Sequence, residues 1–336
     1  METPASTPPH LPTLFQRPDR VADPLYVLLP VSNSARYRTR WKLYEDAVKM
    51  CTEAGAIPYT VEVAFGHRAF AITQADNPQH VQLRTSHEFW FKEHACNLGA
   101  RHLPPTAKYL AYIDTDTRFA RDDWANETVQ RLQHYACVQM WSEYHLLDAD
   151  YHLIGSSPSL MASYLHGWPR NTPHVGTTYP YPRAGKVPWP GPPGLAWAWR
   201  KDAWDAVGGL LDVCILGSAD TYMAFGLLAR LTDDLVSPTF SPGYRRAIYR
   251  WQERAAVLLR NVGVVPGLAL HYWHGSMKSR GYSTRNQILI ANQFDPHEDL
   301  MRDHQGLYQL RVRDARTIAI RDGCREYLAS RNEDQV

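Results

Sequence analysis

The chain has 336 residues, of which 44% are hydrophobic and 21% are charged, and its formal net charge at pH 7 is +2. These values are typical of a folded globular protein with one large domain or two small ones. So small a net charge excludes a strong overall attraction to nucleic acid or to an acidic membrane surface.

No segment of the sequence indicates a membrane anchor or a secretion signal. Apolar runs such as 262–270 are too short to cross a bilayer, and the amino-terminal residues contain no apolar signal region. The five cysteines are scattered and include no Cys-x-x-Cys pair, which argues against a zinc knuckle and against a disulfide framework. We therefore expect a cytoplasmic protein with buried free thiols.

The first part of the chain has the pattern of an α/β fold. Residues 1–22 are rich in Pro, Thr and Ser and predict a flexible tail. An apolar strand at 26–31, a helix at 40–54 with one apolar face and an alternating strand at 57–65 follow. Strand, helix, strand in this order is the opening of a doubly wound fold.

Polar residues near these elements are candidates for nucleotide binding. Pro30 and Asn33 lie at the carboxyl end of the first strand, where a base or ribose commonly binds, although Asn33 suits a helix N-cap at least as well. In the predicted helix 87–99, Lys92 could reach a phosphate and Asn97 could hold backbone or ribose. A solvated lysine and an asparagine near a helix end fit each residue alone equally well.

The most informative stretch is 109–119, a buried strand that ends in two carboxylates. Asp114 and Asp116 have one residue between them and reach the carboxyl edge of the sheet, where ligands bind in open α/β folds. Two hard oxygen ligands suit Mg²⁺ or Mn²⁺, and those metals suit a diphosphate. The alternative is a pair that caps the next helix, although Asp122 and Asp123 are better placed for that role.

The middle of the chain combines a helix at 124–134, a strand at 135–141 and a long stretch, 150–195, without strong periodicity. A long insertion of this kind is usually functional or disordered, and its many aromatic residues argue against disorder. Flat rings suit stacking on a sugar or a base, although they could simply pack the loop down. The prolines and aromatics include Pro158, Tyr164, Trp168, Tyr179, Tyr181, Trp189, Pro192 and Pro193.

After a strand and short helix at 194–204, Asp220 lies near the start of a helix at 221–229. It could cap that helix, or it could present a carboxylate to the cleft as a general base for an acceptor hydroxyl. A helix at 244–260 follows, with one apolar face and one arginine-bearing face. Such a face is usually only solvated, though it could meet a polyanion.

A second group of chemically active residues follows the last predicted strand, 262–270. His271 and His274 could complete a metal site that carboxylates begin, and Lys278 and Arg280 could neutralise phosphates. The rest of the chain contains an arginine-rich helix from about 307 to 330, which we expect to pack on the domain.

With these pieces in order, the stretch 25–299 resembles the GT-A class of glycosyltransferases, which use a nucleotide sugar, a divalent metal and an Asp-x-Asp motif. The resemblance rests on four ordered blocks: 26–31 with Asn33; 90–97 with 112–116; 194–198 with 208–210 and 217–220; and His271-x-x-His274-Gly275 with Lys278.

The resemblance implies an α/β fold with a mixed, mostly parallel sheet flanked by helices. A single catalytic domain would occupy 23–300, with a donor half at 23–141 and an acceptor half at 142–300 that carries the aromatic insertion. Residues 301–336 would form a helical extension.

The resemblance also implies residue roles. Asp114 would contact ribose or metal, Asp116 would bind the metal, and His271 or His274 would complete its coordination. Lys278, with Arg280, would hold the diphosphate. Asp220 stands where inverting members place their base, although Ala219 replaces a second acid found in several such families. The cofactor would be Mn²⁺ or Mg²⁺, and a UDP-sugar is the expected donor.

Other functions fit parts of the sequence. A nucleotidyltransferase shares the sheet and the acids, but the loop at 32–36 lacks the glycines that hold a triphosphate. A non-catalytic sugar- or nucleic-acid-binding module would explain the aromatics but not the acids and histidines. Among soluble acceptors, a hydroxymethylated pyrimidine in DNA is one possibility, because similar compact enzymes occur in bacteriophage DNA modification.

Overall fold

A seven-stranded sheet with the strand order β10-β6-β9-β4-β1-β2-β3 organises the computed structural model, which describes residues 23–168, 190–282 and 284–335. All neighbouring strands run parallel except β9, which is antiparallel to β4 and β6. The strands are β1 (Leu25–Ser32), β2 (Ile57–Phe65), β3 (His80–Thr85), β4 (Tyr109–Ile113), β6 (Cys137–Gln139), β9 (Ala196–Arg200) and β10 (Val262–Val264).

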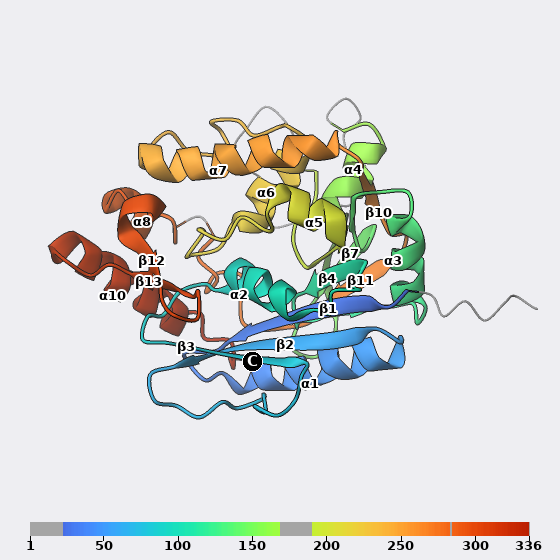
Figure 1. The fold of residues 1–336 in the computed structure, drawn as a ribbon, viewed down its shortest axis with the longest axis horizontal. Coiled ribbons are helices and arrows are strands. Elements are labelled where there is room, and N and C mark those ends of the chain that lie inside the picture. Colours follow the sequence, from blue (N-terminus) through green and yellow to red (C-terminus); the bar gives the residue numbers. More distant parts are fainter. Residues whose placement is uncertain (1–22, 169–189, 283, 336) are drawn as a thin grey trace, which may run out of the picture.

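Helices cover both faces of this sheet (Figure 1). Side chains alternate across a strand, so Val27 and Leu29 of β1 face one core and Leu28 faces the other. The first core includes residues of α1 (Arg38–Glu53) and α3 (Trp124–Leu132). The second includes residues of α2 (Lys92–Gly99), α5 (Lys201–Val207), α6 (Ala219–Leu227) and α7 (Pro242–Ala255). The expected mostly parallel α/β sheet flanked by helices is confirmed.

A smaller sheet, in the order β5-β11-β7-β8, adjoins the main one. Its strands are β5 (Thr117–Phe119), β7 (Glu143–Leu147), β8 (Leu153–Pro158) and β11 (Leu268–His271). Only residues 114–116 separate β4 from β5, so the Asp-x-Asp motif is the passage from the large sheet to the small one.

The expectation of one strand at 262–270 is wrong, because the run is divided between the two sheets. β10 ends at Val264 and pairs with β6, whereas β11 begins at Leu268 and pairs with β5 and β7. Pro266 lies in the break and has no N–H for a ladder, and Gly267 has a φ of 150° that L side chains rarely adopt.

The stretch 150–195 is more regular than its composition predicts. β8 forms a hairpin with β7, and α4 (Leu160–Leu165) begins at Ser159, whose hydroxyl accepts a hydrogen bond from the Ala162 backbone N–H. The expectation of an irregular stretch is therefore wrong for 153–165. Residues 169–189, including Tyr179, Tyr181 and Trp189, and the predicted tail 1–22 lie outside the described residues.

The helix expected at 307–330 is also shorter than predicted. β12 (Leu300–Arg302) and β13 (Tyr308–Leu310) form a two-stranded sheet, and α10 (Ala315–Ser330) begins only after Asp314. Asp314 and Thr317 form a capping box, which defines that start. The remaining helices are α8 (Gln287–Ala291) and α9 (Pro296–Asp299). Among the described residues, every helix is too short or too polar to cross a membrane.

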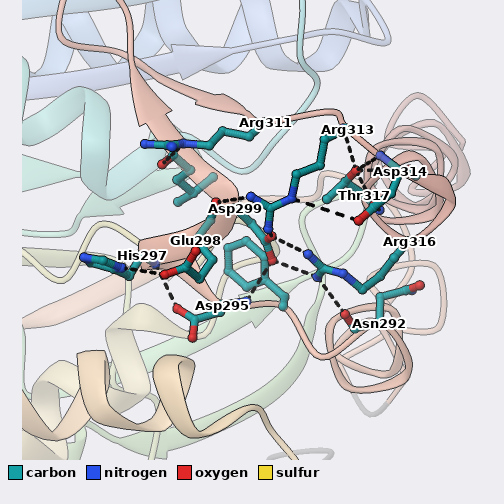
Figure 2. Close-up of polar contacts among 12 residues, drawn as sticks. Asn292, Asp295, His297, Glu298, Asp299, Arg311, Arg313, Asp314, Arg316 and Thr317 are labelled. Atoms are coloured by element: carbon teal, nitrogen blue, oxygen red, sulfur yellow. Dashed lines mark hydrogen bonds and ion pairs between the residues drawn. The ribbon is translucent and has the colours of Figure 1, made fainter.

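The carboxylate of Asp299 ties α10 to the rest of the domain (Figure 2). It is 0% exposed and accepts hydrogen bonds from both Arg313 and Arg316 and from the Asp295 backbone N–H. Arg316 also donates to the Asn292 carbonyl at 3.0 Å. A buried charge held by two guanidinium groups contributes to stability only while both partners remain.

We predict that Asp299→Asn lowers the free energy of unfolding by about 1–3 kcal/mol, because it removes the buried anion that accepts hydrogen bonds from two partly exposed arginines. Urea unfolding followed by circular dichroism measures this loss. The matched control is Asp322→Asn on α10, whose carboxylate pairs with Arg321 and is 44% exposed, and its effect should stay within about 0.5 kcal/mol. Equal effects of the two variants would contradict the stabilising role of Asp299.

Candidate metal and substrate site

Three potential metal ligands meet where the two sheets join. The Nε2 atoms of His271 and His274 lie 3.0 Å apart. The Asp116 carboxylate lies 3.0 Å from the His274 Nε2 and 3.6 Å from the His271 Nε2. The ligand atoms of these three residues all lie within 4.8 Å of one another, close enough to hold one metal ion. The structure therefore brings together three of the four residues expected to bind metal.

Strand register explains this convergence. β11 pairs with β5 so that His271 stands opposite Thr117, the residue after Asp116. The next backbone N–H, that of Tyr272, donates to the Asp116 carbonyl at 2.8 Å. Residues more than 150 positions apart thus become neighbours through an ordinary antiparallel ladder.

The two imidazoles are suited to bind a metal rather than a proton. Burial lowers the pKa of both histidines, and it lowers that of His274 to about 3, so both rings are neutral. The Nδ1 of His271 shares a 2.8 Å hydrogen bond with the Tyr144 hydroxyl, which can leave Nε2 free as a ligand. In the described part of the chain, Asp116 Oδ1 is buried without a hydrogen-bond partner.

A divalent cation fits this group of donors. Two neutral nitrogens 3.0 Å apart repel unless a proton or a cation lies between them, and a carboxylate beside them supplies the negative charge. Two imidazoles and one carboxylate suit a transition metal such as Mn²⁺ better than Mg²⁺, which prefers oxygen ligands.

Asp114 has a different environment from Asp116. Its two carboxylate oxygens lie 3.0 and 3.1 Å from the Lys92 ammonium, and it does not belong to the ligand group. Burial raises the pKa of Asp114 to about 6, although Lys92 opposes that shift. Lys92 therefore contacts the Asp-x-Asp motif, and its ammonium also lies 3.7 Å from Glu93.

Two cavities meet at the ligand group. The first lies at the carboxyl end of β1, and its lining includes Pro30 and Asn33. The second has a volume of ≈ 460 Å³ and is lined in part by Asp220 and Arg280. Both are lined by the same six residues at their junction, which are Trp90, Lys92, Asp114, Asp116, His274 and Arg331.

Asp220 stands in the second cavity, in the first turn of α6. Ser218, not Asp220, occupies the N-cap position, so the capping interpretation of Asp220 does not hold. Its carboxylate lies over Gly194: a Cβ at Gly194 would come within 2.5 Å of Asp220 Oδ2. The absence of a side chain at Gly194 leaves room for the carboxylate in this position. Asp220 is half-buried, and one oxygen accepts the Thr221 backbone N–H at 2.8 Å.

The remaining predicted site residues lie as follows. The Asn33 side chain bonds the backbone N–H and carbonyl of Tyr37, the residue before α1, while Asn33 also lines the first cavity. Asn97 bonds the backbone of Leu210 and lines neither cavity. Lys278 is exposed and also lines neither cavity.

The carboxyl-terminal segment also belongs to the site, although its sequence did not predict this. Glu333 is 1% exposed and pairs with Arg40 of α1 and with Arg331. Burial acts to raise the pKa of Glu333, but the two arginines outweigh it and lower the pKa to about 2. Trp90 lies under the Arg331 guanidinium, 5.0 Å from it. Neither periodicity nor a motif marks residues 331–335 for this role.

Comparisons with known proteins give only distant similarities. No profile of a known protein family matches the sequence, and no curated protein matches it. One solved structure with a similar fold is the catalytic domain of Drosophila β1,4-galactosyltransferase 7 in complex with xylobiose. The two sequences are 12% identical, and the TM-score is 0.30. The match covers 62% of this chain and 61% of that chain. This chain thus spans less than two thirds of that galactosyltransferase chain.

Two further solved structures have similar scores. A putative nucleotide-diphospho-sugar transferase from Desulfovibrio desulfuricans G20 is 12% identical, with 80% of this chain and 97% of that chain covered and a TM-score of 0.34. The 4-diphosphocytidyl-2C-methyl-D-erythritol synthase from Anaerococcus prevotii is 13% identical, with 73% and 88% covered and a TM-score of 0.32. Similarities this distant assign no activity to the chain.

We predict that Mn²⁺ stabilises the protein and that His274→Gln weakens Mn²⁺ binding at least about tenfold, because one ligand is lost. Free Mn²⁺ at 100 times its dissociation constant should raise the free energy of unfolding by about 2.7 kcal/mol. Calorimetric titration measures the affinity. His297→Gln, at a side chain 90% exposed on α9, is the matched control. Unchanged Mn²⁺ affinity in His274→Gln would rule out this ligand.

Proposed function

We propose that the protein transfers a sugar from a nucleoside-diphosphate sugar to an acceptor hydroxyl, with Mn²⁺ or Mg²⁺ at the Asp116 site. The observation that carries this proposal is the convergence of Asp116, His271 and His274 at the junction of two cavities, one of which contains the carboxylate of Asp220. Sugar transfer requires donor and acceptor to be held together at one reacting carbon, and two adjoining cavities provide for this.

We place the nucleoside half of the donor at the mouth of the first cavity. This cavity begins at the carboxyl end of β1, the edge where ligands bind in open α/β sheets, and its lining includes Pro30, Asn33 and the ring of Trp90. The junction would then hold the diphosphate, near the ligand group and the Lys92 ammonium. We expect a UDP-sugar as the donor.

The second cavity suits the acceptor and the reaction. A metal at the ligand group would offset the charge that develops on the leaving nucleoside diphosphate. The acceptor oxygen attacks the anomeric carbon as the bond from that carbon to the phosphate oxygen breaks. Asp220 accepts the proton of the attacking hydroxyl. Ala219 is buried beside it, so the sequence-adjacent position supplies no second acid.

Two of the four arginines on α7 are held by partners within the fold. Arg245 is paired with Asp233 at 2.6 Å, and Arg254 donates to the Val207 carbonyl at 2.7 Å. Neither residue lines the two cavities, and α7 packs against α5 and α6 (Figure 1). These two arginines are therefore occupied within the fold, away from the ligand group.

We predict that Asp220→Asn lowers kcat for transfer by about 10²–10⁴-fold, because the amide cannot accept the acceptor proton. Binding of UDP in the presence of Mn²⁺ should remain within about twofold of wild type. A screen of UDP-, GDP- and other nucleotide sugars by thermal shift identifies the donor first, and steady-state kinetics and calorimetry then separate the two effects. Parallel losses of kcat and of UDP affinity would point to a structural role for Asp220.

We predict the opposite pattern for Asp116→Ala. Loss of a metal ligand should remove the Mn²⁺ dependence of donor binding together with turnover. Donor hydrolysis, which transferases catalyse slowly without an acceptor, provides the assay. Wild-type turnover of Asp116→Ala in saturating Mn²⁺ would show that the metal binds elsewhere, and no hydrolysis or binding of any nucleotide sugar by the wild type would sink the proposed function.

A further inference from the structure

The second cavity is lined by two buried arginines that form no direct ion pair with a carboxylate in the described part of the chain. Arg280 and Arg285 are 2% and 7% exposed, and both line this cavity. Among the described residues, no acidic oxygen lies within 4.0 Å of either group. Arg331 lines the same cavity and differs from them, because it is paired with Glu333.

Neutral partners satisfy only part of the hydrogen-bonding capacity of these arginines. Arg285 donates to the Tyr327 hydroxyl at 3.2 Å and to the Ser218 hydroxyl at 2.9 Å. Arg280 donates to the Gly275 carbonyl at 3.3 Å. The Nε atom of each arginine is buried and has no hydrogen-bond partner in the part of the chain that the structure describes.

The charge of Arg285 affects the pKa of the neighbouring Tyr327. Its hydroxyl accepts from Arg285 and, at 3.0 Å, from Arg331, and it donates to the Arg280 carbonyl at 3.0 Å. Burial alone would raise the pKa of this phenol, yet Arg285 and Arg331 hold it below its ordinary value. The charge of the Arg285 guanidinium is therefore felt at the Tyr327 hydroxyl behind the cavity wall.

A buried arginine cannot lose its proton, so an anion must compensate it or the protein bears the cost of an uncompensated charge. Carboxylates and phosphates match the fork of N–H groups on a guanidinium. Both guanidinium groups belong to residues that line the second cavity, where such an anion would bind.

The position of Arg285 indicates which substrate carries the anion. Its guanidinium contacts Ser218, two residues before Asp220, and a Cβ on Gly217 would lie 3.0 Å from its Nη2. It therefore lies on the side of the proposed base, whereas the diphosphate of the donor belongs beside Asp116 and the histidines. An anion at Arg285 would come from the molecule that presents its hydroxyl to Asp220.

We propose that the acceptor is acidic and that Arg285 binds its carboxylate or phosphate group beside Asp220. The assignment to the acceptor rests on the proposed sugar transfer, whereas the anion site itself rests on the buried guanidinium group in the cavity wall. The site would select anionic acceptors over neutral ones, because a neutral group would leave the charge of Arg285 unpaired.

The test is calorimetric titration of the full chain with inorganic phosphate, without nucleotide and again with saturating Mn²⁺ and UDP. We expect one phosphate to bind in both states and Arg285→Gln to weaken its binding at least tenfold in both. Arg325→Gln, at a side chain 53% exposed on α10, should bind phosphate as the wild type does. Thermal unfolding should show ligand-free Arg285→Gln to be at least as stable as wild type, since an uncompensated charge is removed.

The outcomes separate this proposal from the proposed function. Phosphate binding that Mn²⁺ and UDP abolish would assign the arginines to the donor diphosphate and overturn the acidic acceptor, while sugar transfer would stand. Phosphate binding by a chain that does not bind UDP would confirm the anion site and sink the sugar transfer. Absence of phosphate binding in both states would overturn the anion site.

A competition experiment then identifies the anion-bearing substrate. In the complex with Mn²⁺ and UDP, methyl β-D-glucuronide and glucose 6-phosphate should displace bound phosphate, and methyl β-D-glucoside should not. Equal displacement by the neutral glucoside would contradict selection of an acidic acceptor.

Discussion

The antiparallel pairing of β5 with β11 is the constraint on which the site depends. β4 ends in the large sheet and β5 begins in the small one, so residues 114–116 must cross between them. With His271 opposite Thr117, the imidazole lies beside the Asp116 carboxylate. A shift of the register by one residue would turn His271 to the other face of the sheet and separate the ligands. The junction of the two cavities is therefore set by backbone hydrogen bonds.

Several buried charges around this junction are balanced in pairs. Lys92 faces Asp114, and Glu333 faces Arg40 and Arg331. Burying such a pair costs little free energy only when both charged groups stay in contact. This requirement limits how far the cavity walls can move. Asp116, beside two neutral imidazoles, and two of the arginines that line the second cavity have no such partner among the described residues. These unbalanced charges mark the places where a metal and an anionic ligand would bind.

The sequence predicted secondary structure well and contacts between distant segments of the chain poorly. β1, β2 and β4 are buried or alternating runs, so periodicity located them within one or two residues. The grouping of Asp116, His271 and His274 was expected from residue types at the ends of strands. By contrast, the division of 262–270 between two sheets depends on Pro266 and Gly267 and on tertiary pairing, which no single-segment pattern contains. Arg331 and Glu333 lie in a polar segment, and their role in the site depends on the contact of Glu333 with α1, which the local sequence does not indicate.

The contact between Arg40 and Glu333 joins residues 293 positions apart, and Gly275 makes room for the segment that carries it. A Cβ at Gly275, where φ is +90°, would lie 3.0 Å from the Arg331 carbonyl. Contacts of such long range carry a large loop-closure entropy and form only when distant parts of the chain are already ordered. One wall of the first cavity therefore closes late in folding. In mild denaturant it should open before the seven-stranded sheet does, and nucleotide affinity would fall while the secondary structure remains intact.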